Sequence, residues 1–395
     1  MHPIRRPVSR RRLLRNTGII TAAAVGAPAL AACGTDPEQS STGSPAAGGD
    51  GTALRFDNWP LYIDIDEEDE NVRPTLAAFE EETGISVEYV EAINSNEEYF
   101  AKILPQLQSG QSIGADLFVV TDWLVARLIG LGYLQELDQA NLATVQENID
   151  PALADPSFDP GRLYSVPWQS GITGIAYNAA EFPDGITSLD QLLTDPALAG
   201  KVTLFSGMRE SLPILAGAQG NGLGGFTDAD VDAALAKVQK AVADGQIRRF
   251  TGNDYTDDLA VGNIVAALAW SGDVAQLQFD NPDLKFVIPD EGGELWSDNM
   301  VVPVGAANKK NAEMLMDWYY QPEMAADLVN WTGYICPVPA AKDVLLGYGD
   351  EFSVASANSP LVFPAEADLV NVETSRELTE EEEKQYETDW NAIVT

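Results

Sequence analysis

Short apolar segments alternate with amphipathic helices from residue 53 onward. The segments 53–56 and 85–90 read as strands, and the helical pattern 74–83 between them is closed by Gly84, because glycine readily adopts the left-handed conformation that ends a helix. Segment 117–120 is apolar throughout, as strands of a parallel sheet covered on both faces are. This alternation predicts an α/β fold with helices on both faces of a sheet.

Two longer helices are expected nearer the C-terminus. Thr227 with Asp230, and Thr379 with Glu382, have the spacing of N-terminal capping pairs. The acidic run 380–383 is interpreted as a solvated first turn that also suits the helix dipole. The apolar positions expected to face the core are Val231, Ala234, Leu235, Val238 and Val242 in the first helix and Tyr386, Trp390 and Ile393 in the second.

The first 32 residues have the composition of an export signal. They contain six arginines, no Asp or Glu, and an apolar stretch at 19–30 that is too short to span a membrane. Residues 9–15, Ser-Arg-Arg-Arg-Leu-Leu-Arg, resemble a twin-arginine signal. Residues 30–34, Leu-Ala-Ala-Cys-Gly, resemble a lipobox, which predicts removal of 1–32 and lipidation of Cys33.

A flexible tether is expected to follow the lipidated cysteine. Residues 33–52 carry no large apolar side chain after Cys33, so they bury too little surface to offset the entropy of ordering. We therefore expect an exported protein, periplasmic or at the cell surface, held at the outer face of the cytoplasmic membrane by its lipid alone.

The inventory of reactive side chains excludes several classes of enzyme. The sequence has one histidine, His2, inside the predicted signal, and Cys336 is the one cysteine besides Cys33. No Ser-His-Asp triad, Cys-His dyad or histidine-ligated zinc site can be built from these residues. No cofactor is predicted, and the net charge of −38 disfavours nucleic-acid partners.

Tryptophans near acidic or amide side chains provide a positive signal. Five of them are expected in loops or at strand ends and not on helical core faces: Trp59, Trp123, Trp168, Trp270 and Trp296. Aromatic faces attract a desolvated ammonium ion, and neighbouring carboxylates neutralise it. If these side chains converge, they predict a site for a small organic cation.

Segments spread over nearly the whole chain after residue 53 combine into one pattern. The opening segment 54–63 reads Leu-Arg-Phe-Asp-Asn-Trp-Pro-Leu-Tyr-Ile, and 289–298 reads Pro-Asp-Glu-Gly-Gly-Glu-Leu-Trp-Ser-Asp. Between and after them come 79–87, 95–102, 115–120, 164–168 and 332–334. In this order they resemble the spermidine/putrescine-binding proteins of polyamine ABC transporters.

The resemblance implies a type II periplasmic-binding-protein fold. Two α/β lobes would be joined by two crossing strands, near 173–176 and 293–297, with the ligand in the cleft between them. The expected divisions are a signal at 1–32, a lipidated tether at 33–52, lobe 1 at 53–174 plus 297–343, and lobe 2 at 175–296 plus 344–395. The implied function is capture of a polyamine by a monomer that delivers it to ABC permease subunits, without turnover.

The resemblance also implies a set of ligand-binding residues. In this sequence they are Trp59, Tyr62, Thr121, Trp123, Glu210, Trp270, Trp296, Asp298 and Tyr334. Asp298 matches the carboxylate that grips a terminal amine, and Glu210 matches a second acid.

Two positions depart from the family pattern. Gly207 stands where the spermidine binder has an aspartate, and Leu61 replaces the acid after the opening tryptophan. The acidic insertion 64–70 is interpreted as a surface loop. Other carboxylates that could substitute are Asp122, Asp254 and Asp273.

Two alternatives stay open at this point. The same fold could bind another cationic metabolite or a metal such as ferric iron, for which Tyr319 and Tyr320 are an adjacent pair, although their helical context favours core packing. A secreted polysaccharide hydrolase with two carboxylates is the other alternative, because tryptophans also stack on sugars.

Overall fold

A computed structural model of the chain describes residues 51–66 and 68–394. Its strands form one ten-stranded sheet with the order β2-β1-β3-β9-β4-β7-β5-β6, while β10 pairs with β9 and β8 with β4. The strands are β1 Ala53–Asn58, β2 Ser86–Glu91, β3 Leu117–Thr121, β4 Ser165–Asn178, β5 Val202–Phe205, β6 Ile247–Thr251, β7 Ala266–Trp270, β8 Leu284–Val287, β9 Gly293–Val301 and β10 Val372–Glu373.

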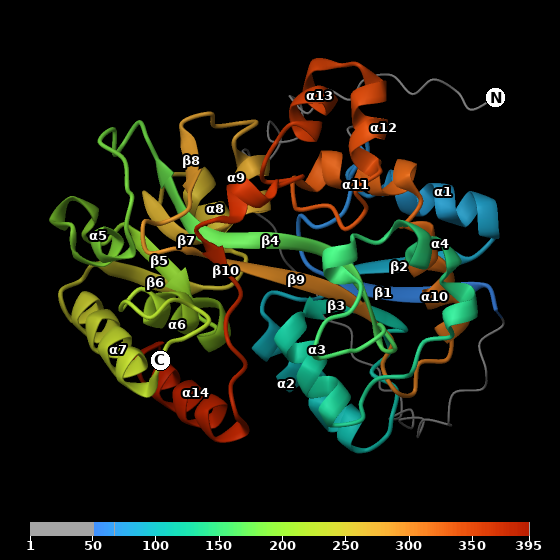
Figure 1. Cartoon of the computed structure of the whole chain (residues 1–395), viewed down its shortest axis with the longest axis horizontal. Coiled ribbons are helices and arrows are strands. Elements are labelled where there is room, and N and C mark those ends of the chain that lie inside the picture. The colour runs from blue at the N-terminus through green and yellow to red at the C-terminus, as the bar shows by residue number, and fades with distance from the viewer. Residues whose placement is uncertain (1–50, 67, 395) are drawn as a thin grey trace, which may run out of the picture.

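The long strands β4 and β9 run through the middle of the sheet and join its two halves (Figure 1). They pair antiparallel along most of their length, and β9 also pairs with β3 while β4 pairs with β7. We define lobe 1 as the half around β1, β2 and β3, and lobe 2 as the half around β5, β6 and β7. The crossings expected near 173–176 and 293–297 fall inside these two strands, and the two-lobe α/β fold is confirmed.

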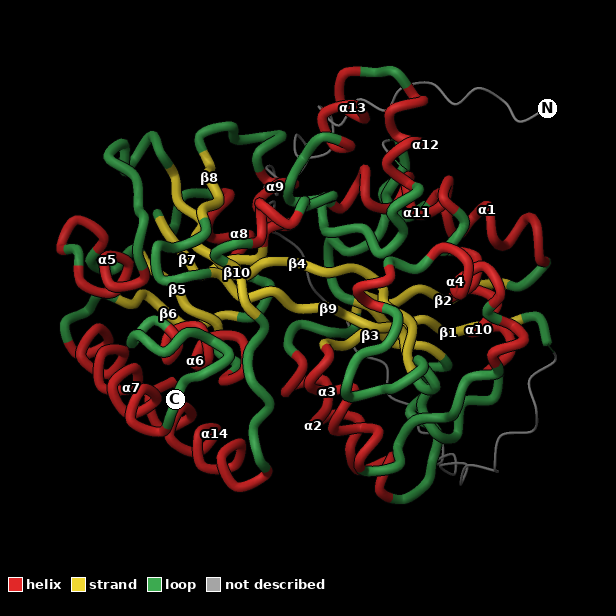
Figure 2. Tube along the Cα trace, viewed as in Figure 1, coloured by secondary structure: helices red, strands yellow, loops and turns green. Residues whose placement is uncertain are grey.

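Helices cover both faces of each half of the sheet (Figures 1 and 2). Beside lobe 1 lie α1 Pro74–Thr83, α2 Asn96–Gln108, α3 Asp122–Gly130, α4 Ala143–Asn148, α10 Lys309–Trp318, α11 Pro322–Thr332, α12 Ala341–Tyr348 and α13 Glu351–Ala357. Beside lobe 2 lie α5 Leu189–Thr194, α6 Met208–Gly217, α7 Asp228–Ala243, α8 Tyr255–Ala260, α9 Ser271–Leu277 and α14 Glu380–Val394.

One expected division of the chain falls inside a helix. The position between 343 and 344 lies within α12, and both α12 and α13 contact α11 beside lobe 1. We propose that the chain passes to lobe 2 after α13. The other boundaries remain predictions.

Local sequence signals place several elements as expected. Helix α1 begins at Pro74 and ends at Gly84, whose φ is 72°. At the start of α7, the backbone N–H and hydroxyl of Thr227 donate to Asp230 Oδ2 at 2.8 and 2.7 Å. The prediction that Val242 faces the core was wrong: its side chain is 39% exposed, because the helix turns Ala241 towards lobe 2 instead.

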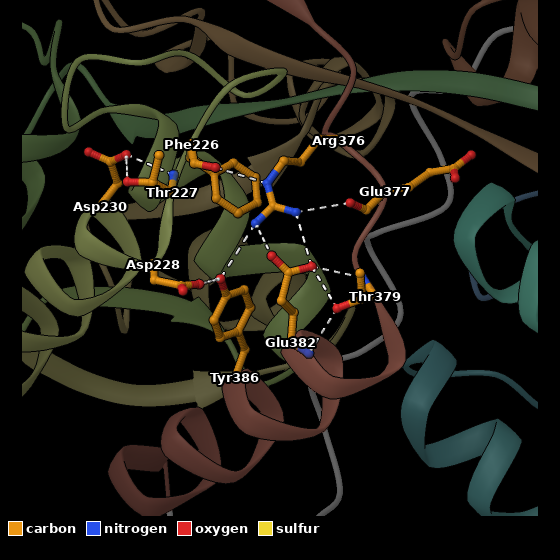
Figure 3. Close-up of polar contacts among 9 residues, drawn as sticks. All are labelled: Phe226, Thr227, Asp228, Asp230, Arg376, Glu377, Thr379, Glu382 and Tyr386. Carbon is orange, nitrogen blue, oxygen red and sulfur yellow. Dashed lines mark hydrogen bonds and ion pairs between the residues drawn. The ribbon is translucent and has the colours of Figure 1, made fainter.

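The start of α14 differs from the solvated turn that the sequence predicted (Figure 3). Arg376 Nη2 donates to Glu382 Oε1 at 2.7 Å, and the Thr379 N–H donates to Glu382 Oε2 at 2.8 Å. The hydrogen bond from Arg376 is the main cause that lowers the pKa of the Glu382 carboxyl to about 2. Glu383 is also ion-paired, with Arg127 and Arg209.

The other end of α14 is packed into lobe 2. Trp390 is fully buried, its Nε1 donates to the Ser206 carbonyl at 2.8 Å, and its ring meets the edge of Phe250 at 5.8 Å. Tyr386 is buried as well. This helix therefore completes the core of lobe 2.

Parts of the sequence analysis fall on residues outside the described ones. These are the predicted signal 1–32, Cys33 and the tether as far as residue 50. Within residues 51–66 and 68–394, no helix combines the length and apolar character needed to cross a membrane.

Candidate functional site

A cleft of about 550 Å³ opens where the lobes meet. It lies beyond the carboxyl ends of β1 and β3 in lobe 1, which are parallel to each other, and of β7 in lobe 2, which is parallel to β5. Open α/β sheets bind ligands at the carboxyl ends of their strands. Its lining residues are Trp59, Pro60, Tyr62, Asn96, Thr121, Trp123, Thr173, Arg209, Glu210, Asn253, Trp270, Asp273, Glu294, Trp296, Asp298 and Tyr334. This volume includes the space at the open mouth of the cleft.

The nine residues expected from the sequence resemblance all lie along this cleft. The resemblance did not include Asn96, Thr173, Asn253 or Glu294. Trp168, in contrast, does not line the cleft: it is 1% exposed in β4 and its Nε1 donates to the Tyr62 carbonyl. Strand β4 lies between β9 and β7 in the middle of the sheet, so Trp168 packs in the core. The adjacent Gln169 was therefore not evidence that Trp168 belongs to a ligand site.

Five aromatic side chains form a continuous wall. Ring centroids lie 5.9 Å apart for Trp59 and Trp270, 6.2 Å for Trp270 and Trp296, 5.8 Å for Trp296 and Tyr334, and 4.8 Å for Tyr334 and Tyr62. Most of these pairs are edge-to-face, the arrangement that the ring quadrupole favours. The rings come from the loop after β1, from β7 and β9, and from the turn after α11, so the wall exists only when the lobes are assembled.

Two glycines allow the wall to approach the backbone. A Cβ on Gly171 would lie 2.4 Å from Trp296 Cζ2, and a Cβ on Gly272 would lie 2.3 Å from Tyr334 Cδ2. Such distances are far below van der Waals contact, so any larger residue would displace a ring. The positions of Trp296 and Tyr334 therefore depend on these two glycines.

The loop after β1 carries two of the wall residues. Leu61 has a φ of 56°, a left-handed conformation that is unusual for a leucine. Its carbonyl accepts a hydrogen bond of 3.1 Å from Gln276 Nε2 in α9. This bond between the lobes supports the turn that separates Trp59 from Tyr62.

Asp298 is the most clearly organised carboxyl of the cleft. It is 4% exposed, and Thr121 Oγ1 donates to its Oδ1 at 2.6 Å. Burial raises the pKa of Asp298 to about 7, against the lowering effect of Thr121. The buried Tyr62 hydroxyl lies near enough to this carboxyl to lower its pKa as well.

Asp273 has a different environment. Its carboxylate accepts hydrogen bonds from Asn253 Nδ2 at 2.9 Å, from the Tyr255 hydroxyl at 2.9 Å and from the Tyr334 hydroxyl at 2.6 Å. Burial raises its pKa to about 6, although the hydrogen bonds oppose the shift. Because three donors already occupy this carboxylate, its main effect is to orient Tyr334.

Glu294 and Arg209 add charge on the lobe 2 side. Burial raises the pKa of Glu294 to about 7, while Ser375, which donates to it, and the nearby Arg209 oppose the shift. The Arg209 guanidinium lies 5.3 Å from the centre of the Trp123 ring and pairs with Glu383 at 3.2 Å. Arg209 is thus already neutralised by α14.

The other carboxylates considered from the sequence lie elsewhere. Asp64 accepts the Thr75 N–H at 2.8 Å in the interior of lobe 1, Asp122 accepts from Asn299 at 2.6 Å, and Asp254 pairs with Arg249 at 2.8 Å. None of these three lines the cleft. Of the four candidates, Asp273 alone reaches it.

The residues considered for iron are part of the core. The Tyr320 hydroxyl donates to the Pro167 carbonyl at 2.8 Å, and the Tyr319 hydroxyl bonds to Thr75 Oγ1 at 2.9 Å. Throughout 51–66 and 68–394, no group of three or more His, Cys, Asp or Glu is placed to hold a metal ion. The packing interpretation of this tyrosine pair is the better one.

Aromatic rings and buried carboxyls together suit an elongated organic cation. The rings can pack on methylene groups and attract ammonium ends, and the carboxylates can neutralise those ends. Fold and cleft define the class: a two-lobe binding protein that encloses a small solute between its lobes.

Comparison with known proteins identifies the family. Residues 75–361 match the bacterial extracellular solute-binding proteins, and the chain belongs to this family. A putrescine/cadaverine-binding protein of Pseudomonas aeruginosa is 31% identical over 299 residues, 72% of this chain and 79% of the relative. A spermidine/putrescine-binding periplasmic protein of Escherichia coli is 27% identical over 332 residues, 84% and 88% of the two chains.

A solved structure supports the same assignment. A protein from Listeria monocytogenes, described as a spermidine/putrescine ABC transporter, has a TM-score of 0.73 at 28% identity, covering 87% of this chain and 98% of the solved one. These relatives are transport proteins, so the comparisons support solute binding and not the polysaccharide-hydrolase alternative.

Proposed function

We propose that this protein captures a linear polyamine of the putrescine or spermidine type in the cleft and delivers it to the permease of an ABC importer. The observation that carries the proposal is the pairing of the five-ring wall with the buried carboxyl of Asp298. A neutral solute could hydrogen-bond to that carboxyl but would leave its buried charge uncompensated, and an anion would be repelled by it.

The proposed ligand-binding residues are the nine that the sequence resemblance implied. Trp59, Trp270 and Trp296 pack on the methylene groups, and Asp298 holds one ammonium. Glu210, on the other side of the cleft, faces the other end of the ligand. The names of relatives that bind putrescine, cadaverine or spermidine support this choice of ligand.

Delivery follows from closure. Both lobes contribute to the cleft, so a bound cation stabilises the closed arrangement, which the permease then recognises. Lipidation of Cys33 would hold the protein as a monomer at the outer face of the membrane, with residues 33–52 as its tether. Cys33→Ser should then move the protein from the membrane fraction to the soluble fraction.

Calorimetric titration with putrescine, cadaverine, spermidine and spermine tests the proposal. We expect one site per chain for at least one of these amines, with weaker binding at high salt because charge pairing is screened. Butane-1,4-diol, which has the four methylenes of putrescine but no charge, is the matched negative ligand. If no amine binds while another cation or a metal ion does, the polyamine proposal is wrong.

A further inference from the structure

Gly207 lies where two carboxyl groups meet. A Cβ at this position would be 1.8 Å from Glu210 Oε2 and 2.8 Å from Glu97 Oε2. The backbone of Gly207 has φ −69° and ψ 135°, which every residue type adopts readily. The space taken by the two carboxyls, and not the backbone, is therefore what requires a glycine here.

The two carboxyls come from opposite lobes. Glu97 lies in the first turn of α2 beside lobe 1, and Glu210 lies in the first turn of α6 beside lobe 2. Both oxygens of Glu97 and Oε2 of Glu210 are buried without a well-formed hydrogen bond among the described residues, although the backbone N–H groups of Glu97 and Arg209 lie near enough to lower the pKa of Glu97. Closing the lobes thus brings two acids together where no cationic side chain is paired with them among the described residues.

Such a pair requires a positive charge or a proton. Burial raises the pKa of Glu97 well above its usual value, and the neighbouring Glu210 raises it further. Two carboxylates in contact cannot both ionise without a cation between them. The site is therefore built for a cationic group or for a shared proton.

A short chain of hydrogen bonds connects Glu210 to Asp298. Asn96 Nδ2 donates to Glu210 Oε1 at 3.2 Å and to Thr121 Oγ1 at 2.9 Å, and Thr121 Oγ1 donates to Asp298 at 2.6 Å. The distance between Glu210 Oε1 and Asp298 Oδ1 therefore cannot exceed the combined length of these three hydrogen bonds. A diamine with a short methylene spacer can reach both.

We propose that Glu97, which is not among the residues lining the cleft but meets the lining residue Glu210 at Gly207, joins Glu210 in binding the second ammonium of the ligand. The inference rests on the proposed function and names the residue that sets its specificity for diamines. The carboxylate that the resemblance would place at position 207 is supplied here by α2, from the opposite lobe. Binding of the second ammonium is then directly coupled to closure.

Glu97→Gln is the test, with Glu98→Gln as matched control because Glu98 is the exposed neighbour in the same helix. Putrescine and butylamine are titrated into each protein; both ligands have four carbons, but butylamine has one ammonium. In Glu97→Gln we expect putrescine affinity to fall about tenfold to a hundredfold, the cost of losing a charged hydrogen bond. Butylamine affinity should be unchanged, as should both affinities in Glu98→Gln.

The outcomes separate the two proposals. If the wild-type protein binds no amine, the proposed function is wrong. If it binds putrescine and Glu97→Gln binds it equally well, the role of Glu97 is overturned while the function stands. Equal losses for putrescine and butylamine would also overturn it, because they indicate a general disturbance of the cleft.

Gly207→Ala is a second variant that does not alter either acid. Its methyl group would push the Glu210 carboxyl away from Glu97, so we expect the same selective loss of putrescine affinity. Thermal unfolding of each variant shows whether it is folded. Unchanged putrescine binding by a folded Gly207→Ala would contradict the proposed site.

Discussion

Thr121 and Asp298 lie directly opposite each other in the register of β3 and β9, and the threonine hydroxyl donates to the carboxyl at 2.6 Å. The sheet pairing itself therefore holds the carboxyl towards the cleft. Because Thr121 lies on a strand of the central sheet, the Asp298 side chain is already held in place before a ligand binds, and binding costs little side-chain entropy.

Replacing the carboxyl tests its role as an anchor. Asp298→Asn keeps the shape of the side chain but removes the charge that would compensate a buried ammonium. We expect a loss of about 3 kcal/mol, roughly a hundredfold in the Kd for putrescine measured by calorimetry. Asp254→Asn, which affects a carboxyl outside the cleft, should bind as the wild type does; equal binding by both variants would argue against the anchor.

Removing the donor should change the pH dependence of binding. The Thr121 hydrogen bond lowers the pKa of Asp298, so Thr121→Val should raise that pKa and make ionisation harder. We expect the loss of amine affinity to be larger near pH 6 than near pH 8, while Thr121→Ser, which keeps the hydroxyl, retains the wild-type profile. If amine affinity depends on pH in the same way in Thr121→Val and in the wild type, this prediction is wrong.

Buried carboxyls should also link ligand binding to proton release. The pKa of Asp298 and Glu294 is about 7 in the folded protein, above the usual values of 3.8 and 4.5. The folded state therefore binds more protons than the unfolded state between about pH 4 and pH 7, so stability without ligand should fall as pH rises through this window. A cation favours the ionised forms, so affinity should rise over the same window.

Two measurements check this linkage. Titrations near pH 6.5 in buffers of different ionisation enthalpy should reveal protons released on binding. The increase in Tm caused by putrescine should be larger near pH 8 than near pH 5. Binding without proton release would show that the ligand does not meet these carboxyls.

The glycines beneath the aromatic wall provide a steric test. Gly272→Ala would place a methyl group 2.3 Å from the Tyr334 ring and so should shift the ring and weaken its bond to Asp273. We expect putrescine affinity to fall about tenfold, comparable to losing an aromatic contact and part of its orientation. Gly130→Ala in α3, where a Cβ meets nothing within 4 Å, is the control, and Tm reports on folding.

How far the sequence predicts this molecule depends on the range of the interactions. Gly84 and the Thr227–Asp230 pair act within a few residues, and the helices they bound were predicted closely. Five of the nine proposed binding residues, Trp59, Tyr62, Trp296, Asp298 and Tyr334, belong to the motifs that carry the resemblance, and the other four were matched to the family singly. Their convergence on one cleft depends on the strand order, which no single motif contains. Asn96 and Glu97 lie in one of those motifs, 95–102, but their neighbours Thr121, Gly207 and Glu210 are distant in sequence.

The wrong predictions have the same origin. From the local sequence pattern, Trp168 was expected at a strand end or in a loop and Val242 in the core. Trp168 is instead buried and Val242 exposed, because their positions depend on packing against elements that are remote in the sequence. Glu382 and Glu383 were expected to be solvated, but the fold brings Arg376 to Glu382 and both Arg127 and Arg209 to Glu383. Ion pairs between remote segments leave no signature in the periodicity of one helix.

Glu383 links the two lobes and should influence the rate of ligand release. It pairs with Arg127 in α3 at 3.3 Å and with Arg209 in α6 at 3.2 Å. Glu383→Gln should change stability by less than about 1 kcal/mol, because the pairs are partly exposed. We expect putrescine to dissociate a few-fold faster in stopped-flow experiments, and Glu381→Gln, an exposed acid in the same turn, to have no effect.

The burial of Trp390 has a consequence for how the protein is made. This side chain fills lobe 2 against Phe250 and Ser206, yet it follows every other described element except the last residues of its own helix. The ribosome therefore supplies it after every other described element, and lobe 2 cannot complete its core until α14 has emerged. Nascent chains that lack α14 will present the apolar surface around Phe250 to chaperones, whereas the sheet of lobe 1 can assemble once β9 has emerged.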